Sequence, residues 1–340
     1  MQDTTTQVRI ALPSKGRMEG ETLDFLAEAG LHVAKTNPRQ YSASIPALPG
    51  ALVLFQRSAD IPRSVAAGDM DLGITGYDNV AEALDGDLDD VVLIHEALGY
   101  GQCELVIAVP ETWAGVSDVA SLARRAAAQG GLRVATKHAS AVERFLSRRG
   151  VEHVRIVSAD GALEAAPAVG YADFIADITS TGTTLHDNRL RPLEDGTVLR
   201  SQAVLIGNRA ALQARPEALA TARQMLEFVE AHLRARGQYL VFANMRGETK
   251  EAVARRVFEQ TELGGLQGPT VSPLVTRSGE GGWWAINIVV AQSRLFSAIQ
   301  QIRAVGGSGV VVTPATYIFE ERPARYQWLL EAIGKAEGPG

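Results

Sequence analysis

The sequence contains one cysteine, Cys103, among its 340 residues. A single thiol excludes an intramolecular disulfide and argues against a zinc site built on cysteine. No apolar run approaches the ~18 residues that a membrane-spanning helix needs. The N-terminal residues also lack the basic segment followed by an apolar one that is typical of a secretory signal. We therefore expect no membrane partner and a cytoplasmic location.

Positive charge is in deficit, because the formal net charge is −6. Nucleic-acid binding requires a basic face, and no helix-turn-helix pattern is found, so we expect no nucleic-acid partner. The negative net charge does not exclude small anionic ligands, since a few backbone amides and cations hold them locally. The six histidines show no H-x-x-x-H pair and no Ser-His-Asp arrangement.

The composition is that of an ordinary globular protein, with 46% apolar and 21% charged residues. The length is too great for one core and predicts two or three domains. Short apolar runs alternate with helical patterns over the first two thirds, which predicts an α/β fold. We expect two α/β lobes that flank a cleft, as in periplasmic binding proteins: residues 1–103 with 190–222, and residues 104–189.

The last third follows the order β-α-β-β-α-β between residues 239 and 313, which is typical of a ferredoxin-like domain. We assign this domain to residues 223–335. Domains of this type often bind a regulator or pair with a second copy. The pattern is equally compatible with a purely structural appendage.

The segment with the most chemistry runs from Asp173 to Leu185. Asp173 and Asp177 are four residues apart on a predicted strand, and even spacing puts them on one face. The loop 179–184 then gathers small hydroxyl residues around a glycine, and such loops can bind phosphate. The carboxylates suit a ribose diol or a magnesium ion. The alternative is an ordinary Ser/Thr turn that caps a helix, but the aspartate spacing favours a site.

Two further segments carry cations directly after predicted strands. Leu12–Arg17 reads LPSKGR, and its two cations and glycine at a helix N-terminus suit an anion. The alternative is a solvated basic turn. Arg57 follows another buried strand and is compatible either with a substrate phosphate or with an ion pair to Asp60.

Two candidates are weaker by themselves. Residues 71–76 form a strand that ends in glycine, which permits close approach of a ligand but also suits a tight turn. Glu164 is a lone carboxylate among small apolar residues. It precedes the strand of Asp177 in the same lobe, although an exposed helix position is the common outcome for such a residue.

Taken in order, these segments resemble ATP phosphoribosyltransferase of histidine biosynthesis, in its long form with a C-terminal regulatory domain. The resemblance covers nearly the whole chain, and its last motif is the most specific. The motifs are LPSKGR (12–17), RSADIP (57–62), DLGITG (71–76), GYGQC (99–103), RVATK (133–137), LEAAP (163–167) and ADFIADITSTGTTL (172–185).

The resemblance implies transfer of phosphoribosyl from phosphoribosyl pyrophosphate to N1 of ATP, with Mg²⁺, inhibition by histidine, and a homo-oligomer (dimer or hexamer). The implied catalytic residues are Lys15, Arg57, Glu164 and Asp177, with Asp173 and Asp177 as metal ligands. The implied contacts of phosphoribosyl pyrophosphate are Glu164, Asp173, Asp177, Thr179, Ser180, Thr181, Gly182, Thr183 and Thr184. The implied contacts of ATP are Lys15, Gly16, Arg17, Arg39, Arg57, Asp71 and Gly76, and those of histidine are Thr270 and Ser272.

Two other classes of protein share the two-lobed pattern. One is the non-enzyme class of solute-binding proteins and effector domains of transcription regulators, against which the missing signal and the missing DNA-reading element argue. The other is a phosphoribosyltransferase that acts on a free base. The LPSKGR and RSADIP motifs favour an acceptor that carries a triphosphate.

Overall fold

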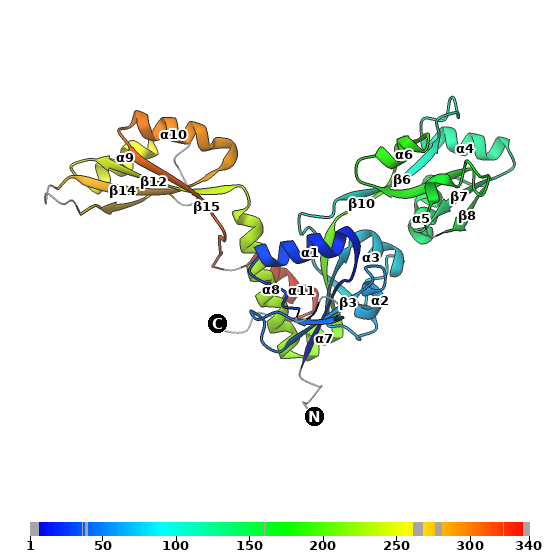
Figure 1. The fold of residues 1–340 in the computed structure, drawn as a ribbon, viewed down its shortest axis with the longest axis horizontal. Coiled ribbons are helices and arrows are strands. Elements are labelled where there is room, and N and C mark those ends of the chain that lie inside the picture. The colour runs from blue at the N-terminus through cyan, green and yellow to red at the C-terminus, as the bar shows by residue number, and fades with distance from the viewer. Residues whose placement is uncertain are drawn as a thin grey trace. The chain divides into compact units, whose positions relative to one another are not determined.

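The computed structural model describes residues 7–35, 37, 40–159, 161–260, 268–275, 281–321 and 323–335. The chain divides into two compact units, residues 1–226 with 322–340 and residues 227–321. The first unit contains two α/β lobes, and the second contains a four-stranded sheet (Figure 1). The predicted fold class is thereby confirmed.

Lobe I is built on a six-stranded mixed sheet with the order β2-β3-β1-β4-β11-β5. The strands are β1 (Val8–Pro13), β2 (Ser42–Ser44), β3 (Ala51–Gln56), β4 (Leu72–Gly76), β5 (Val91–His95) and β11 (Ala203–Asn208). The helices are α1 (Gly16–Glu28), α2 (Ile61–Ala66), α3 (Tyr77–Ala83) and α7 (Arg209–Ala214). β1 is parallel to β3 and β4, whereas β11 is antiparallel to β4 and β5. The carboxyl ends of β1, β3, β4 and β5 therefore meet at one edge of the sheet.

Lobe II has a five-stranded sheet with the order β10-β6-β9-β7-β8. The strands are β6 (Cys103–Pro110), β7 (Leu132–Thr136), β8 (Val154–Ser158), β9 (Phe174–Thr179) and β10 (Leu190–Ser201). The helices are α4 (Val119–Ala128), α5 (Ala139–Arg148), the 3-10 helix η1 (Leu163–Ala165) and α6 (Thr183–Asp187). Because side chains alternate across a strand, β6 turns Leu105 and Ile107 toward α4 and α5, and Val106 and Ala108 toward η1 and α6.

β10 belongs to the sheet of lobe II, although the predicted division assigns residues from 190 onward to lobe I. β10 pairs antiparallel with β6, with Ser201 opposite Cys103. Gln202 separates β10 from β11, and β11 pairs within the sheet of lobe I. The chain thus changes sheets within one residue, at Gln202.

The second unit is a ferredoxin-like sheet with the order β13-β14-β12-β15, in which all neighbours are antiparallel. Its elements are β12 (Gln238–Arg246), α9 (Lys250–Phe258), β13 (Thr270–Pro273), β14 (Trp283–Ala291), the 3-10 helix η2 (Gln292–Arg294), α10 (Leu295–Ala304) and β15 (Ser308–Pro314). Val241, Ile286 and Ile288 on one face of the sheet pack with Val257 of α9 and Ile302 of α10.

The second unit begins within one helix and ends shortly before another. The limit between the units falls inside α8 (Pro216–Ala235), and α11 (Ala324–Ala332) returns to the first unit. The predicted regulatory domain spans 223–335, so it includes α11, whereas the compact unit ends at residue 321.

A buried ion pair joins two segments of lobe I that are far apart in the sequence. Asp71, which is 1% exposed, precedes β4 and accepts hydrogen bonds from the backbone N–H of Arg9 (2.7 Å) and from Arg215 Nη1 (2.7 Å). Arg215 follows α7 directly. The pair therefore ties the start of α8 to the centre of the sheet.

We predict that Arg215→Met lowers the free energy of opening of the β1 and β4 amides by about 3 kcal/mol, because it leaves the buried Asp71 carboxylate with only the longer ion pair to Arg9 at 3.7 Å. Hydrogen exchange of these amides measures the change. Arg63→Met, at an exposed position of α2, serves as the control and should stay within about 0.5 kcal/mol of the parent. Equal protection in the two variants would contradict the role given to Arg215.

Candidate functional site

The carboxyl edge of the lobe I sheet gathers the predicted cations. Lys15 and Arg57 follow the neighbouring parallel strands β1 and β3, whose last residues, Pro13 and Gln56, are in register. The backbone N–H of Ser14 donates to Gln56 O at 2.8 Å, which keeps the two connections together. Both cations are exposed. In the part of the chain that the structure describes, no ion pair links Arg57 to Asp60, so the guanidinium is available to a ligand.

Gly76 and Asp71, which were both predicted to contact ATP, lie at opposite ends of β4. Gly76 is buried at the carboxyl end and precedes α3, and a Cβ there would come within 2.3 Å of Asp78 Oδ1. Asp71 precedes the other end of the strand and is engaged by Arg215. The structure therefore does not bring Asp71 to the edge that carries Lys15 and Arg57.

The loop 179–184 of lobe II is held by its own hydroxyl groups. Thr179 Oγ1 accepts from the backbone N–H of Gly182 at 2.9 Å, and the hydroxyls of Thr181 and Thr183 are 3.0 Å apart. Gly182 has φ = 76°, a left-handed conformation that residues with a Cβ rarely adopt. The turn places Thr183 and Thr184 at the start of α6. Hydrogen bonds within the turn thus fix an exposed loop rich in hydroxyl groups.

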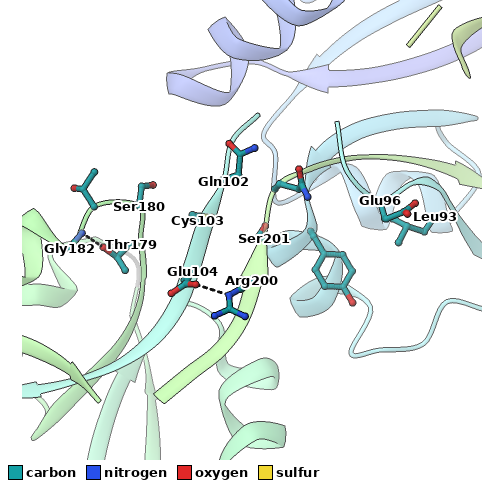
Figure 2. Close-up of a pocket in the computed structure, with 13 residues that line it drawn as sticks. Leu93, Glu96, Gln102, Cys103, Glu104, Thr179, Ser180, Gly182, Arg200 and Ser201 are labelled. Atoms are coloured by element: carbon teal, nitrogen blue, oxygen red, sulfur yellow. Dashed lines mark hydrogen bonds and ion pairs between the residues drawn. The ribbon is translucent and has the colours of Figure 1, made fainter. Parts of the chain in front are cut away.

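The cation segment and the hydroxyl loop meet across the lobes. Arg17 of α1 donates from Nη2 to Ser180 Oγ at 3.3 Å. A pocket of about 800 Å³ adjoins this contact and is lined by residues of both lobes (Figure 2). The lining residues are Tyr77, Leu93, Glu96, Gln102, Cys103, Glu104, Thr179, Ser180, Thr181, Gly182, Arg200, Ser201 and Gln202. The size is sufficient for a nucleotide-sized ligand.

Several lining residues were not predicted from the sequence. Arg200 Nε donates to Glu104 Oε1 at 2.8 Å, and Ser201 Oγ donates to Asp78 Oδ1 at 2.7 Å. Burial raises the pKa of the Cys103 thiol, and the charge of Asp78 adds to this effect. Cys103, Glu104, Arg200 and Ser201 lie where β6 enters lobe II and β10 leaves it. The GYGQC motif ends at this point, but no sequence pattern marks the matching end of β10.

Asp177 lies within a group of charged side chains in lobe II. It follows Ile175 by two residues on β9, so it shares the face that packs on η1, where Glu164 lies. Burial raises the pKa of the Asp177 carboxyl, and the negative charge of Glu164 raises it further. The backbone N–H of Ile178, which donates to Asp177 Oδ1 at 2.8 Å, acts in the opposite direction, as do His138 and Lys137.

Asp173 is engaged elsewhere. Its carboxylate accepts from Arg133 Nη2 at 3.0 Å and from the backbone N–H of Arg133 at 2.7 Å, and this guanidinium lowers the pKa of Asp173. Asp173 precedes β9 and Asp177 is its fourth residue, so several ångströms of extended chain separate them. The described residues contain no group of three or more potential metal ligands. Asp173 is thus held by Arg133, and the metal site expected at Asp173 and Asp177 stays a prediction.

Three further predicted contacts remain, and two of them belong to the second unit. Arg39 lies outside the described residues. Thr270 and Ser272 belong to β13 in the second unit, where they pair with Asn287 and Ala285 on the face opposite to Val271. Asn287 Oδ1 is buried and has no hydrogen-bond partner among the described residues.

The two lobes are also linked through α3 and α5. Glu82 of α3 accepts hydrogen bonds from the backbone N–H groups of Ser140 and Ala141, both at 3.1 Å, at the start of α5. Arg144 of α5 donates from Nη2 to Ala81 O at 2.9 Å and forms an ion pair with Asp85. A carboxylate of lobe I thus caps a helix of lobe II.

Comparison with known proteins gives consistent matches. The family model described as "ATP phosphoribosyltransferase" matches residues 57–230, and the one described as "HisG, C-terminal domain" matches residues 235–317. The protein named ATP phosphoribosyltransferase 2, chloroplastic, of Arabidopsis thaliana is 47% identical, over 96% of this chain and 81% of its own. ATP phosphoribosyltransferase of Gemmatimonas aurantiaca is 38% identical, over 90% of this chain and 97% of its own.

Among solved structures, the ATP phosphoribosyl transferase (HisG:HisZ) complex from Thermotoga maritima is similar in fold. The TM-score is 0.51 at 24% identity, over 66% of this chain and 98% of the other. Within the described residues, no helix has the length and apolarity to cross a bilayer.

We predict that Glu82→Ala weakens the start of α5 by about 1 kcal/mol, because two N-terminal amides lose their acceptor. Hydrogen exchange at Ser140 and Ala141 should accelerate about fivefold. Glu143→Ala, at an exposed position of the same helix, is the matched control and should leave both amides protected. If both variants exchange at the parent rate, the cap across the lobes contributes nothing in solution.

Proposed function

This chain belongs to the ATP phosphoribosyltransferase family of histidine biosynthesis, and we propose that it transfers the phosphoribosyl group of phosphoribosyl pyrophosphate to N1 of ATP. The observation that carries the proposal is the contact between Arg17 and Ser180 beside the 800 Å³ pocket. It joins a cationic edge that suits polyphosphate to a hydroxyl loop that suits a sugar phosphate.

Each lobe would bind one part of the reacting pair. The loop 179–184 would hold the 5-phosphate through its backbone N–H groups and hydroxyls, and the carboxylates of Glu164 and Asp177 would accept hydrogen bonds from the ribose diol. Lys15, Arg17 and Arg57 would neutralise the triphosphate of ATP and the departing pyrophosphate. Gly16 would permit close approach of ATP at this edge, whereas a Cβ at Gly76 would meet Asp78. We do not include Asp71 or Asp173, since each is held by an arginine.

The reaction requires no side-chain nucleophile. The lone pair of adenine N1 forms the bond to the anomeric carbon, while the carbon–oxygen bond to pyrophosphate breaks and its electron pair leaves with pyrophosphate. Positive charge develops on the ribose and negative charge on the leaving group. Alignment of the two substrates and charge stabilisation by Lys15, Arg17 and Arg57 would therefore supply most of the catalysis.

Magnesium fits this arrangement only in part. Glu164 and Asp177 are neighbouring carboxylates, and Mg²⁺ commonly takes one or two carboxylates and completes its shell with phosphate oxygens and water. The ion would shield the negative charge of pyrophosphate. Its other ligands would come from the substrate, because Asp173 is paired with Arg133.

The second unit would bind histidine as a feedback inhibitor. Support comes from Thr270 and Ser272 on the open face of its sheet, and from the buried Asn287 Oδ1, which has no hydrogen-bond donor among the described residues. We also propose that the chain forms a homo-oligomer and acts in the cytoplasm, although the name of the Arabidopsis relative places that protein in the chloroplast.

A coupled assay tests the proposal. The protein is mixed with ATP, phosphoribosyl pyrophosphate and Mg²⁺, with pyrophosphatase to drive the reaction, and the ultraviolet absorbance of N1-substituted adenine is followed. We expect product with ATP, none with free bases, and suppression by histidine. Product that histidine does not suppress would keep the enzyme and remove the role given to the second unit. Folded protein that forms no product would contradict the proposed reaction.

We predict opposite effects of Asp177→Asn on activity and stability. Turnover should fall by at least about tenfold, because the amide cannot replace the charged acceptor. Stability at pH 7 should rise, by on the order of 2 °C in melting temperature, because burial makes the ionised carboxylate costly.

The pH dependence of this stabilisation provides the check. The pKa of Asp177 is raised in the fold, so its protonated form is favoured there and the parent loses stability as pH rises through that pKa. The gain in the variant should therefore shrink as the pH is lowered toward 4. Differential scanning fluorimetry over this range, with Asp187→Asn of the exposed end of α6 as the control, measures it. A variant that melts lower than the parent at pH 7 would refute the assigned environment.

A further inference from the structure

Helix α11 is a part of the first unit that neither family match covers. It spans Ala324–Ala332, whereas the matches end at residue 317. Leu329, Leu330 and Ile333 are buried, and Gln213 Nε2 donates to Ile333 O at 2.9 Å. The helix contacts β5 of lobe I. α11 is therefore a built part of lobe I at its end nearest β5.

The first turn of α11 reaches the proposed substrate pocket through one ion pair. Arg325 donates from Nη1 and Nη2 to the two carboxylate oxygens of Glu96. This guanidinium is the main reason why the pKa of Glu96 lies below its usual value. Both side chains keep some exposure, at 29% for Arg325 and 52% for Glu96. The geometry is the two-point pairing that arginine forms with carboxylates.

Glu96 lies on the same sheet edge as the cations of the site. It follows β5 directly, and β5 and β4 both pair with β11, so their carboxyl ends are on one side. Glu96 lines the pocket together with Ser180 and Thr181 of the hydroxyl loop. A lone carboxylate at this position would repel a polyphosphate, since charges that share a pocket interact over several ångströms.

We propose that Arg325 is a positioning residue for polyanion binding, in that α11 neutralises Glu96 and keeps the pocket receptive to phosphate-bearing substrates. The inference rests on the proposed function for the identity of the ligands. The charge effect itself does not depend on that function. Removal of Arg325 leaves Glu96 unpaired and lowers affinity for anions, and removal of both charges restores it. A purely structural pair behaves differently, because loss of both partners then does not restore binding.

The lone cysteine supplies a probe that needs no substrate. Cys103 is the only thiol of the chain and lines the same pocket. Its alkylation rates with anionic iodoacetate and with neutral iodoacetamide are measured at low salt. The rate with iodoacetate divided by the rate with iodoacetamide does not depend on the thiolate fraction. This ratio therefore reports the electrostatic potential at Cys103. We expect Arg325→Gln to lower the ratio about twofold. The double variant Arg325→Gln, Glu96→Gln should return it to within the error of the parent.

Pyrophosphate binding, measured by calorimetry with Mg²⁺, gives the second readout. We expect Arg325→Gln to raise the dissociation constant about fivefold, less at high salt, and the double variant to regain at least half of the loss on a logarithmic scale. Arg303→Gln removes the same charge from an exposed position of α10 in the other unit and serves as the control.

The outcomes separate the two proposals. An unchanged alkylation ratio in Arg325→Gln, or a double variant as impaired as the single one, overturns the role of Arg325. If the parent binds no pyrophosphate while the ratio behaves as expected, the proposed function fails and the charge effect stands. If Arg325→Gln does not fold, Glu96→Gln alone tests the proposal, and the expected change in the alkylation ratio then has the opposite sign. This variant removes the negative charge that Arg325 offsets in the pocket, so the ratio should rise, and no rise overturns the proposal.

Discussion

The chain crosses between the lobes on two strands that are hydrogen-bonded to each other, and the pocket depends on this pairing. β6 enters lobe II and β10 leaves it, with Ser201 opposite Cys103 and Arg200 opposite Glu104. Both crossings therefore pass the same place, and their side chains line the pocket beside the loop of Ser180 (Figure 2). The cap of Glu82 on α5 adds a second link between the lobes.

The candidate site is built from charged side chains that would destabilise most other parts of a fold. The cations at the edge of lobe I are left exposed. Partial burial raises the pKa of Asp177, and the charge of Glu164 raises it further. Charges that the fold does not neutralise are available to a charged ligand, and they cost stability while the ligand is absent. By contrast, the buried pair of Asp71 and Arg215 is neutralised internally and serves the fold.

The second unit is an insertion with respect to the first. The chain leaves the first unit within α8 and returns to it at α11, and α11 carries the arginine that pairs with Glu96 in the pocket. The same helix is anchored at its end by Gln213 and by Arg209, which donates to Ala332 O. The C-terminal helix thus contributes to the electrostatics of a site formed by residues more than 100 positions earlier in the chain.

Local pattern determined much of this protein by itself. The alternation of short apolar runs and helical segments identified the two lobes and the β-α-β-β-α-β domain, because side-chain periodicity is a property of neighbouring residues. The motifs at Leu12–Arg17 and in the loop 179–184 marked two parts of the pocket. Only the tertiary structure decided which charges are free, since Arg215 and Arg133 reach Asp71 and Asp173 across 144 and 40 positions. It also decided that Glu96 meets Arg325, because contacts between distant segments leave no spacing in the sequence.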